Sequence, residues 1–245
     1  LVKDVTENME KFELGIAAQK IYDFIWDEFC DWYIEMVKPR LYRDVDETKG
    51  AAIWTLKTVL TTALKLLHPY MPFITEEIFC TLKELESKGE EEESIMISSW
   101  PEYQESLSFA AEEEAVETIK QAVKSIRGVR SGMNVPPSRK AAVIVVSAQD
   151  RIREIFEGSR VFFSTLAAAS EVSIQADKTG IAQDAVSAVI PGATLYMPLS
   201  DLVDIEKEIA RLNKERDRLT GEIKRSQGML SNENFVKKAP AAKIK

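Results

Sequence analysis

The chain has 245 residues, of which 45% are hydrophobic and 29% charged, and its formal net charge is −8. This composition excludes intrinsic disorder, a collagen-like fibre and a small disulfide scaffold. No apolar run approaches the ~20 residues that a membrane-spanning helix needs. Cys30 and Cys80 are too few for a disulfide framework and are not spaced as metal ligands, which favours a cytoplasmic protein. Because the chain begins at Leu1 rather than at a methionine, we expect it to be part of a longer protein.

The negative charge is unevenly distributed. Residues 1–100 have a net charge of −9, residues 101–200 of −2, and residues 201–245 of +3. No acidic residue lies between Glu117 and Asp150, and this acid-free window contains six cations, Lys120, Lys124, Arg127, Arg130, Arg139 and Lys140. We interpret it as a candidate polyanion site, with a solvated basic face as the alternative.

The first hundred residues have the apolar periodicity of amphipathic helices. It predicts one long helix over 7–37, with Phe12 on its apolar stripe, that ends at Pro39. Two further helices are predicted over 47–67 and 72–85, and short connections between all three indicate a bundle. The aromatic residues of 26–35 are expected in its core. Lys38 and Arg40 either stabilise the helix dipole or reach a phosphate.

A fourth helix is predicted over 110–129, and Pro136 and Pro137 prevent its continuation, so residues 131–138 should form an ordered loop. Beyond it, a strand at 141–147, a helix over 152–166, a strand at 172–174 and a hairpin of 185–190 with 194–199 indicate a small α+β unit.

From Leu202 the apolar residues follow a seven-residue repeat, which predicts a coiled-coil arm with a seam of Leu202, Ile205, Ile209, Leu212, Leu219, Ile223 and Leu230. Residues 231–234 should end this helix, and Pro240 should open a returning one. Four lysines at 237, 238, 243 and 245 could add nonspecific attraction to phosphates.

Motifs for catalysis are missing from the sequence. It contains no phosphate-binding glycine loop and no nucleophile elbow, and its single histidine, His68, excludes a two-histidine zinc site. We therefore expect no catalytic residue, no metal site and no cofactor in these residues.

Several motifs are long enough to carry a family resemblance. The segments FCDWYIE at 29–35, KPRL at 38–41 and HPYMPFITEE at 68–77 resemble the anticodon-binding domain of class I aminoacyl-tRNA synthetases. The segments IRGVRSGMNVPP at 126–137 and LSNENFVKKAPA at 230–241 resemble valyl-tRNA synthetases in particular. The resemblance implies a mainly α fold: an anticodon-binding helical bundle over 1–138, a small α+β subdomain over 139–200, and the first arm and turn of a truncated C-terminal coiled coil over 201–245.

The same resemblance implies a part of a valine–tRNA ligase that recognises tRNA while the parent enzyme attaches valine with ATP. The expected tRNA-binding residues are Lys38, Arg40, Arg127, Arg130, Asn134, Arg139 and Lys140. The bundle would hold the anticodon stem-loop and the coiled coil would reach the outer corner of the valine tRNA. ATP and Mg²⁺ belong to a catalytic domain outside these residues.

Two alternatives remain open at this point. One is a protein-interaction scaffold that uses the bundle and the coiled coil; the other is the anticodon domain of the isoleucine or leucine enzyme. We expect the parent to be a monomer that does not enter membranes, and this chain to self-associate through its unpaired arm.

Overall fold

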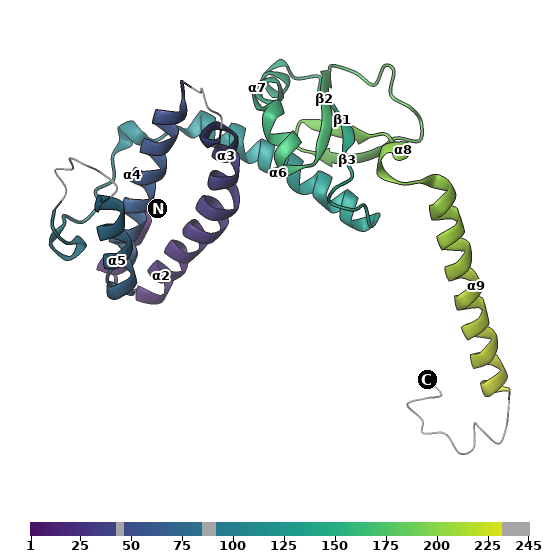
Figure 1. The fold of residues 1–245 in the computed structure, drawn as a ribbon, viewed down its shortest axis with the longest axis horizontal. Coiled ribbons are helices and arrows are strands. Elements are labelled where there is room, and N and C mark those ends of the chain that lie inside the picture. The colour runs from purple at the N-terminus through teal and green to yellow at the C-terminus, as the bar shows by residue number, and fades with distance from the viewer. Residues whose placement is uncertain (43–46, 85–91, 232–245) are drawn as a thin grey trace. The chain divides into compact units, whose positions relative to one another are not determined.

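The structure is a computed structural model that describes residues 1–42, 47–84 and 92–231, apart from the side chains of 205–208. It is 65% helical with one small mixed sheet, which confirms the predicted mainly α class with a small α+β part (Figure 1). The chain divides into two compact units, residues 1–113 and 114–245, and each is described by itself. The predicted domain limits at 138 and 200 stay predictions.

The first unit is helical. It contains α1 (Val2–Glu10), α2 (Leu14–Asp23), a π-helical segment η1 (Phe24–Ile34), α3 (Glu35–Leu41), α4 (Lys49–Leu67), α5 (Pro72–Glu84) and the short 3-10 turns η2 (Ile95–Ile97) and η3 (Glu105–Leu107). Its core includes two clusters of described residues. Leu66 of α4 packs with residues of α1 and α2, whereas Leu64 packs with Phe79 of α5 and with Ile95. Helix α4 therefore joins both halves of the bundle.

The prediction of one continuous helix over 7–37 is wrong at its beginning. Helix α1 starts at Val2 and ends at Glu10. Phe12 has a φ of 60°, its N–H donates to Met9 O at 3.0 Å, and the N–H of Glu13 donates to Asn8 O at 2.8 Å. This pair of bonds is a Schellman motif, which ends a helix with one residue in the left-handed region. Phe12 takes the place that glycine usually occupies.

The predicted end of this helix at Pro39 is also wrong, since Pro39 lies inside α3. A proline removes one N–H donor, but the N–H of Tyr42 still donates to Lys38 O at 3.1 Å, so the last turn is completed. The preceding segment η1 is π-helical instead of α-helical, and of its aromatic residues Phe29 and Trp32 are buried, whereas Trp26 is 57% exposed. The aromatic core prediction is thus confirmed in part.

The motif at 68–77 connects α4, α5 and η2. The Thr75 hydroxyl, fully buried, donates to Met71 O at 2.8 Å and lies 2.7 Å from Nδ1 of His68. The Glu76 carboxylate accepts hydrogen bonds from Ser94 Oγ at 2.9 Å and from the N–H of Ile95 at 3.2 Å. His68 and Glu76 therefore have structural partners inside the bundle.

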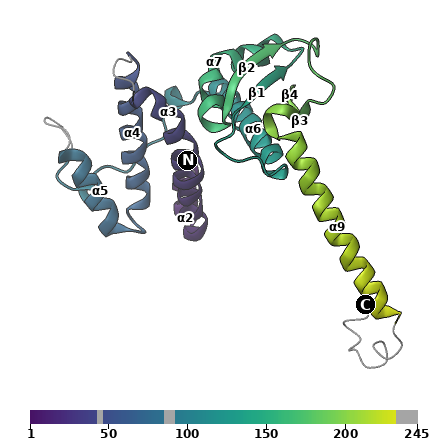
Figure 2. The ribbon, with the colours of Figure 1, turned by 45° about the vertical axis from the view of Figure 1, so that its right-hand side comes forward.

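The second unit contains most of α6 (Ala110–Gly132), then β1 (Ala141–Val146), α7 (Asp150–Leu166), β2 (Ala169–Gln175), β3 (Val186–Ile190), β4 (Ala193–Met197), α8 (Leu199–Leu202) and α9 (Ile205–Leu230). The sheet order is β2-β1-β4-β3 (Figure 2). Strands β1 and β2 are parallel and are connected through α7, whereas β4 runs antiparallel to both β1 and β3. Alternate β1 residues, Ala141, Val143 and Val145, are buried.

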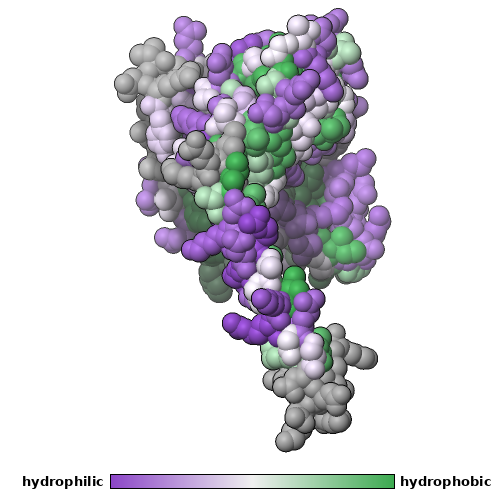
Figure 3. Space-filling view, turned by 90° about the vertical axis from the view of Figure 1, so that its right-hand side faces the viewer, coloured by the Kyte–Doolittle hydropathy of each residue, from purple (hydrophilic) through white to green (hydrophobic). Residues whose placement is uncertain are grey.

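The predicted hairpin is confirmed as β3 and β4, joined at Pro191 and Gly192, and Gly192 has a φ of 79°. The predicted beginning of the coiled coil is wrong: Leu202 is 1% exposed and belongs to α8 and the core, and the arm helix α9 begins only at Ile205. On α9 the seam residues Ile209, Leu212, Leu219 and Ile223 are 44–57% exposed. Apolar side chains interrupt the hydrophilic surface of the arm (Figure 3). The predicted returning helix and the lysines after 236 lie outside the described residues.

Candidate nucleic-acid interface

Arg130 stabilises the loop that follows α6. Its side chain is buried, with 6% exposure, and its guanidinium donates to Pro136 O at 3.2 Å and to Arg139 O at 2.5 Å. Burial lowers the pKa of Arg130, but a guanidinium stays protonated in proteins. The charge of Arg130 is thus used to satisfy main-chain carbonyls that the loop would otherwise leave without donors.

Arg127 and Arg139 also donate to main-chain carbonyls. Nε of Arg127 reaches Leu166 O, at the end of α7, at 2.7 Å. Nε of Arg139 donates to Asp201 O at 2.5 Å, and a terminal nitrogen of the same guanidinium donates to Ser200 O at 2.9 Å. Because these arginines donate to main-chain carbonyls, their guanidinium groups have hydrogen-bond acceptors although the window from Thr118 to Gln149 contains no carboxylate.

Asn134 and Lys140 lie beside these arginines. Asn134 is exposed with a φ of 54°, its N–H donates to Ser131 O at 3.0 Å, and the N–H of Val135 donates to Arg130 O at 2.9 Å. Asn134 is therefore the left-handed residue of a second Schellman motif, a position where asparagine is a recognised substitute for glycine. Lys140 is exposed directly before β1.

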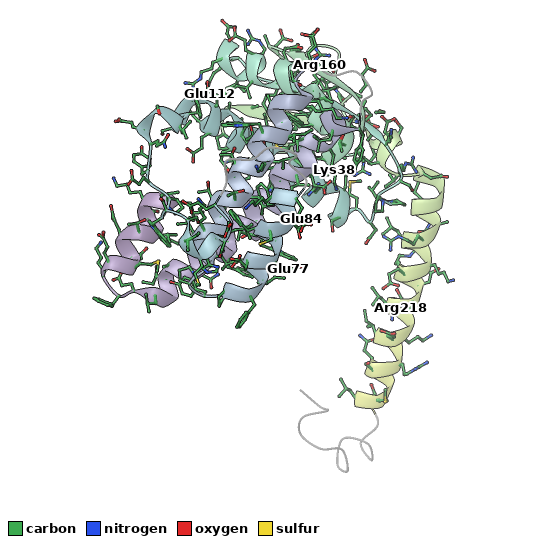
Figure 4. The ribbon with its side chains drawn as sticks, turned by 60° about the vertical axis from the view of Figure 1, so that its left-hand side comes forward. Lys38, Glu77, Glu84, Glu112, Arg160 and Arg218 are labelled. Carbon is green, nitrogen blue, oxygen red and sulfur yellow. The ribbon has the colours of Figure 1, made fainter. Side chains whose placement is uncertain are left out.

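Lys38 and Arg40 lie in the other unit, and both have partners there. Lys38, labelled in Figure 4, donates to the Glu35 carboxylate, and this hydrogen bond raises the pKa of Lys38. Arg40 donates from Nε to the Thr48 hydroxyl at 2.9 Å and from a terminal nitrogen to Thr48 O at 2.8 Å, which connects α3 with the start of α4. The structure thus brings Arg127, Arg130, Asn134, Arg139 and Lys140 together in one unit. Contact of any of the seven residues with RNA stays a prediction.

The two most exposed aromatic residues among the described residues of the first unit could not be identified from the sequence. Phe12 is 87% exposed and Phe73 is 90% exposed. Phe12 lies between α1 and α2, and Phe73 is the second residue of α5. The Tyr70 hydroxyl, just before α5, donates to Leu14 O, at the start of α2, at 2.9 Å and so connects the two neighbouring segments. Phe12 holds a left-handed backbone, which costs an ordinary residue about 1–2 kcal/mol, and its exposed ring recovers little of that cost. Strain of this kind is common at functional sites.

Nothing in the sequence identified Phe12, because its spacing also fits the stripe of an amphipathic helix. Glycine, the usual signal for a helix end, is absent from this segment. Phe73 lies in the first turn of α5. The apolar periodicity of this helix begins at Ile74, so it gave no reason to single out Phe73.

The arm helix α9 has a surface of mixed charge. Arg218, shown on the arm in Figure 4, donates to Glu215 at 2.6 Å and to Glu222 at 2.6 Å. These pairs raise the pKa of Arg218, and the hydrogen bond with Arg218 lowers the pKa of Glu215. Exposed ion pairs of this kind add little to the stability of a helix, because water screens them. The described part of the arm is thus an exposed helix that presents both charged and apolar side chains.

Among residues 1–42, 47–84 and 92–231, no helix is both long and apolar enough to cross a membrane, and no group of three or more histidine, cysteine or acidic side chains could hold a metal ion.

Comparisons with known proteins now assign the two parts of the chain. Residues 1–145 match the family model described as the anticodon-binding domain of tRNA ligase, and residues 204–244 match the model described as the valyl tRNA synthetase tRNA binding arm. The chain is also similar to valine–tRNA ligases, with 50% identity over 244 residues in Clostridium acetobutylicum and 52% over 244 residues in Clostridium tetani. In Bacillus subtilis the identity is 37% over 240 residues.

These matches cover 98–100% of this chain but only 26–27% of each relative. The chain thus spans about a quarter of the relatives' length, and it corresponds to their C-terminal part. The first match covers the helical unit, α6 and most of β1, and the second covers the arm helix α9, whereas β2, β3 and β4 lie between the two matches. The chain belongs to the family of anticodon-binding domains of tRNA ligases, followed here by the tRNA-binding arm of valyl-tRNA synthetases.

Proposed function

We propose that this chain is the tRNA-recognition part of a cytoplasmic, monomeric valine–tRNA ligase, which attaches valine to valine tRNA with ATP. The observation that carries the proposal is the succession, on one chain, of an anticodon-binding domain and a tRNA-binding arm. The catalytic reaction, with its ATP and Mg²⁺, belongs to the part of the parent protein that these residues do not include.

In this proposal, different parts of the chain contact different parts of the tRNA. Unpaired anticodon bases can stack on exposed aromatic rings, and Phe12 and Phe73 offer two such rings in the helical unit. Lys140, exposed beside β1, contributes a phosphate contact, whereas Arg130 mainly maintains the loop from which Lys140 and Asn134 project. The arm helix α9 contributes contacts at the outer corner of the tRNA.

Binding at the anticodon contributes to catalysis at a distance. A tRNA held at its anticodon and its outer corner has few orientations left for its acceptor end. The parent enzyme thereby converts recognition energy into placement of the reacting hydroxyl. The proposed role of these residues is thus to bind and orient, with the chemical step carried out by the rest of the parent.

The test is a titration of the chain with valine tRNA at low salt, compared with the same tRNA carrying an altered anticodon. Tighter binding of the unaltered tRNA is expected, and phenylalanine-to-alanine changes at Phe12 and Phe73 should remove most of the difference. Base–aromatic stacking is worth about 1–3 kcal/mol per base, so each change should weaken binding about 5-fold or more. Equal affinity for both tRNAs would contradict anticodon recognition.

A second role is favoured by the apolar seam on α9. Leu212, Leu219 and Ile223 are each about half exposed, and unpaired apolar stripes of this kind mark interaction surfaces. We infer that this chain, taken alone, pairs with a second copy along the seam. Sedimentation that is independent of concentration would contradict this pairing, and it would also remove the main support for a protein-interaction scaffold.

A further inference from the structure

Hydrogen bonds connect the short helix α8 with the loop between α6 and β1 and with the start of β1. Arg139, in the loop, donates from Nε to Asp201 O at 2.5 Å and from a terminal nitrogen to Ser200 O at 2.9 Å. In return, the Asp201 carboxylate accepts the N–H of Ala142 at 3.0 Å. Arg130 in turn holds Arg139 O. A continuous series of hydrogen bonds therefore runs from the end of α6 to α8.

These hydrogen bonds matter for the arm because α8 lies directly before the arm helix α9. Helix α8 has four residues, and the last carbonyls of any helix lack partners within it, so the Arg139 guanidinium supplies the missing donors. Leu202, at the end of α8, is 1% exposed and anchors the helix in the core. Only Val203 and Asp204 separate α8 from α9. The point at which the arm leaves the sheet is thus set by the attachment of α8.

We propose that Arg139 and Asp201 are positioning residues that fix the root of the tRNA-binding arm, so that the arm can contact the tRNA outside its anticodon stem-loop. This inference rests on the proposed function. It assigns Arg139 a role that depends on the fork geometry of its guanidinium, which a lysine cannot reproduce. A direct phosphate contact, by contrast, depends mainly on charge, which a lysine retains.

Three variants of the full chain separate these roles: Arg139→Lys keeps the charge, Asp201→Ala removes a negative charge, and Lys140→Met is the control at an exposed neighbouring cation. Their affinities for complete valine tRNA and for its isolated anticodon stem-loop are compared at one salt concentration. Arg139→Lys and Asp201→Ala should each weaken binding of the complete tRNA about tenfold, equivalent to about 1.4 kcal/mol, and leave stem-loop binding unchanged.

The Asp201→Ala variant is the sharpest of the three. Removal of an acidic residue should strengthen RNA binding if long-range charge alone mattered, so weaker binding is specific to loss of the arm's attachment. Lys140→Met should reduce the affinity for both RNAs alike if Lys140 contacts a stem-loop phosphate. Full affinity for the complete tRNA in Arg139→Lys, or tighter binding in Asp201→Ala, would overturn the proposal.

Hydrogen exchange supplies a readout that does not depend on RNA. In Arg139→Lys and Asp201→Ala the amides of residues 199–204 should exchange faster, and in Asp201→Ala so should the amide of Ala142, which loses its acceptor. The remaining amides of β1 and those of β4 should keep their protection. Loss of protection throughout the sheet, or no change at α8, would contradict a role confined to the arm root. If the unaltered chain binds neither RNA, the proposed function fails, and the exchange data still decide whether these residues hold the arm.

Discussion

At the scale of single residues, two different residue types occupy the left-handed position of the two Schellman motifs. Asn134 occupies the left-handed position after α6, where asparagine is well tolerated, whereas Phe12 occupies it after α1. Asparagine there is explained by the turn itself. Phenylalanine is not, since its ring is 87% exposed and adds little packing. This contrast makes Phe12 the stronger candidate for a role outside the fold.

The strain at Phe12 leads to a stability prediction. Phe12→Gly should be more stable than Phe12→Ala by about 1 kcal/mol, because both lose the ring but only alanine keeps a Cβ in the left-handed region. Thermal unfolding monitored by calorimetry measures the difference, which corresponds to about 4 °C for a unit of 113 residues. Equal stability of the two variants would show that φ at Phe12 is not left-handed in solution. Both variants should bind the anticodon stem-loop more weakly than the unaltered chain.

Glu76 leads to a pH prediction. Burial raises its pKa, but hydrogen bonds from Ser94, Cys80 and the N–H of Ile95 together outweigh burial and hold the pKa of Glu76 below its ordinary value of 4.5. A carboxyl group with a lowered pKa stabilises the folded state above the pKa of the unfolded chain, and this stabilisation is lost as the pH falls through the folded-state pKa.

Glu76→Gln should therefore lower the melting temperature of the helical unit at pH 7, and the difference from the unaltered chain should shrink as the pH falls below 4.5. The matched control is Glu77→Gln, an equal change of charge at the exposed neighbouring residue. It should leave the melting temperature nearly unchanged. A deficit for Glu76→Gln that persists undiminished at low pH would mean that packing, and not ionisation, accounts for it.

At the scale of elements, the hairpin of β3 and β4 combines a turn and a contact at one glycine. Gly192 has a φ of 79°, and a Cβ on it would lie 3.3 Å from Cγ1 of Ile152 in α7. Gly180 also has a φ of 79°, but a Cβ there would meet nothing within 4 Å. Substituting the two glycines in turn therefore distinguishes the loss of stability caused by a left-handed backbone from the loss caused by contact with Ile152.

Gly180→Ala should destabilise the second unit by about 1–2 kcal/mol through its backbone alone. Gly192→Ala should cost more, because Ile152 must also move. Chemical denaturation of the two variants measures the difference, and a larger loss for Gly180→Ala would contradict the close packing of the turn against α7.

Most elements could be predicted because their signals are local. The apolar periodicity of α4, α5 and α6, the β-branched run of β1 and the proline–glycine turn each specify one structure in a short window. The predictions were wrong where one local pattern of apolar residues was compatible with two different structures. Phe12 and Leu202 each fit a helical repeat, and only tertiary packing decides that one ends a helix in a left-handed turn and the other is buried in α8.

The candidate site was less predictable than the fold for a related reason. Composition identifies the acid-free window, but a sequence does not show whether an arginine donates to a phosphate or to a carbonyl. In the structure Arg127, Arg130 and Arg139 have carbonyl acceptors that lie 6 to 62 residues away along the chain. Such pairings depend on the packing of α6, α7 and α8, which no short window of sequence contains.

At the scale of the whole molecule, net charge separates the proposed RNA-binding role from a protein scaffold. The chain has a net charge of −8, so its attraction to RNA must come from local groups, chiefly exposed lysines and the positively charged last segment. Each phosphate contact contributes a slope of about −0.7 to −0.9 to the dependence of log affinity on log salt concentration.

Affinity for valine tRNA should therefore fall linearly on this logarithmic scale, and Lys140→Met should reduce the slope by about one contact, or 0.7–0.9. Self-association through the seam should behave in the opposite way, because apolar contacts persist or strengthen as kosmotropic salt is added. A double change that adds no charge, Leu212→Gln with Leu219→Gln, should abolish the dimer in sedimentation experiments and leave the salt slope for tRNA unaltered. If tRNA affinity instead tracks the dimer and ignores salt, the seam is the binding surface and the basic residues are only a solvated face.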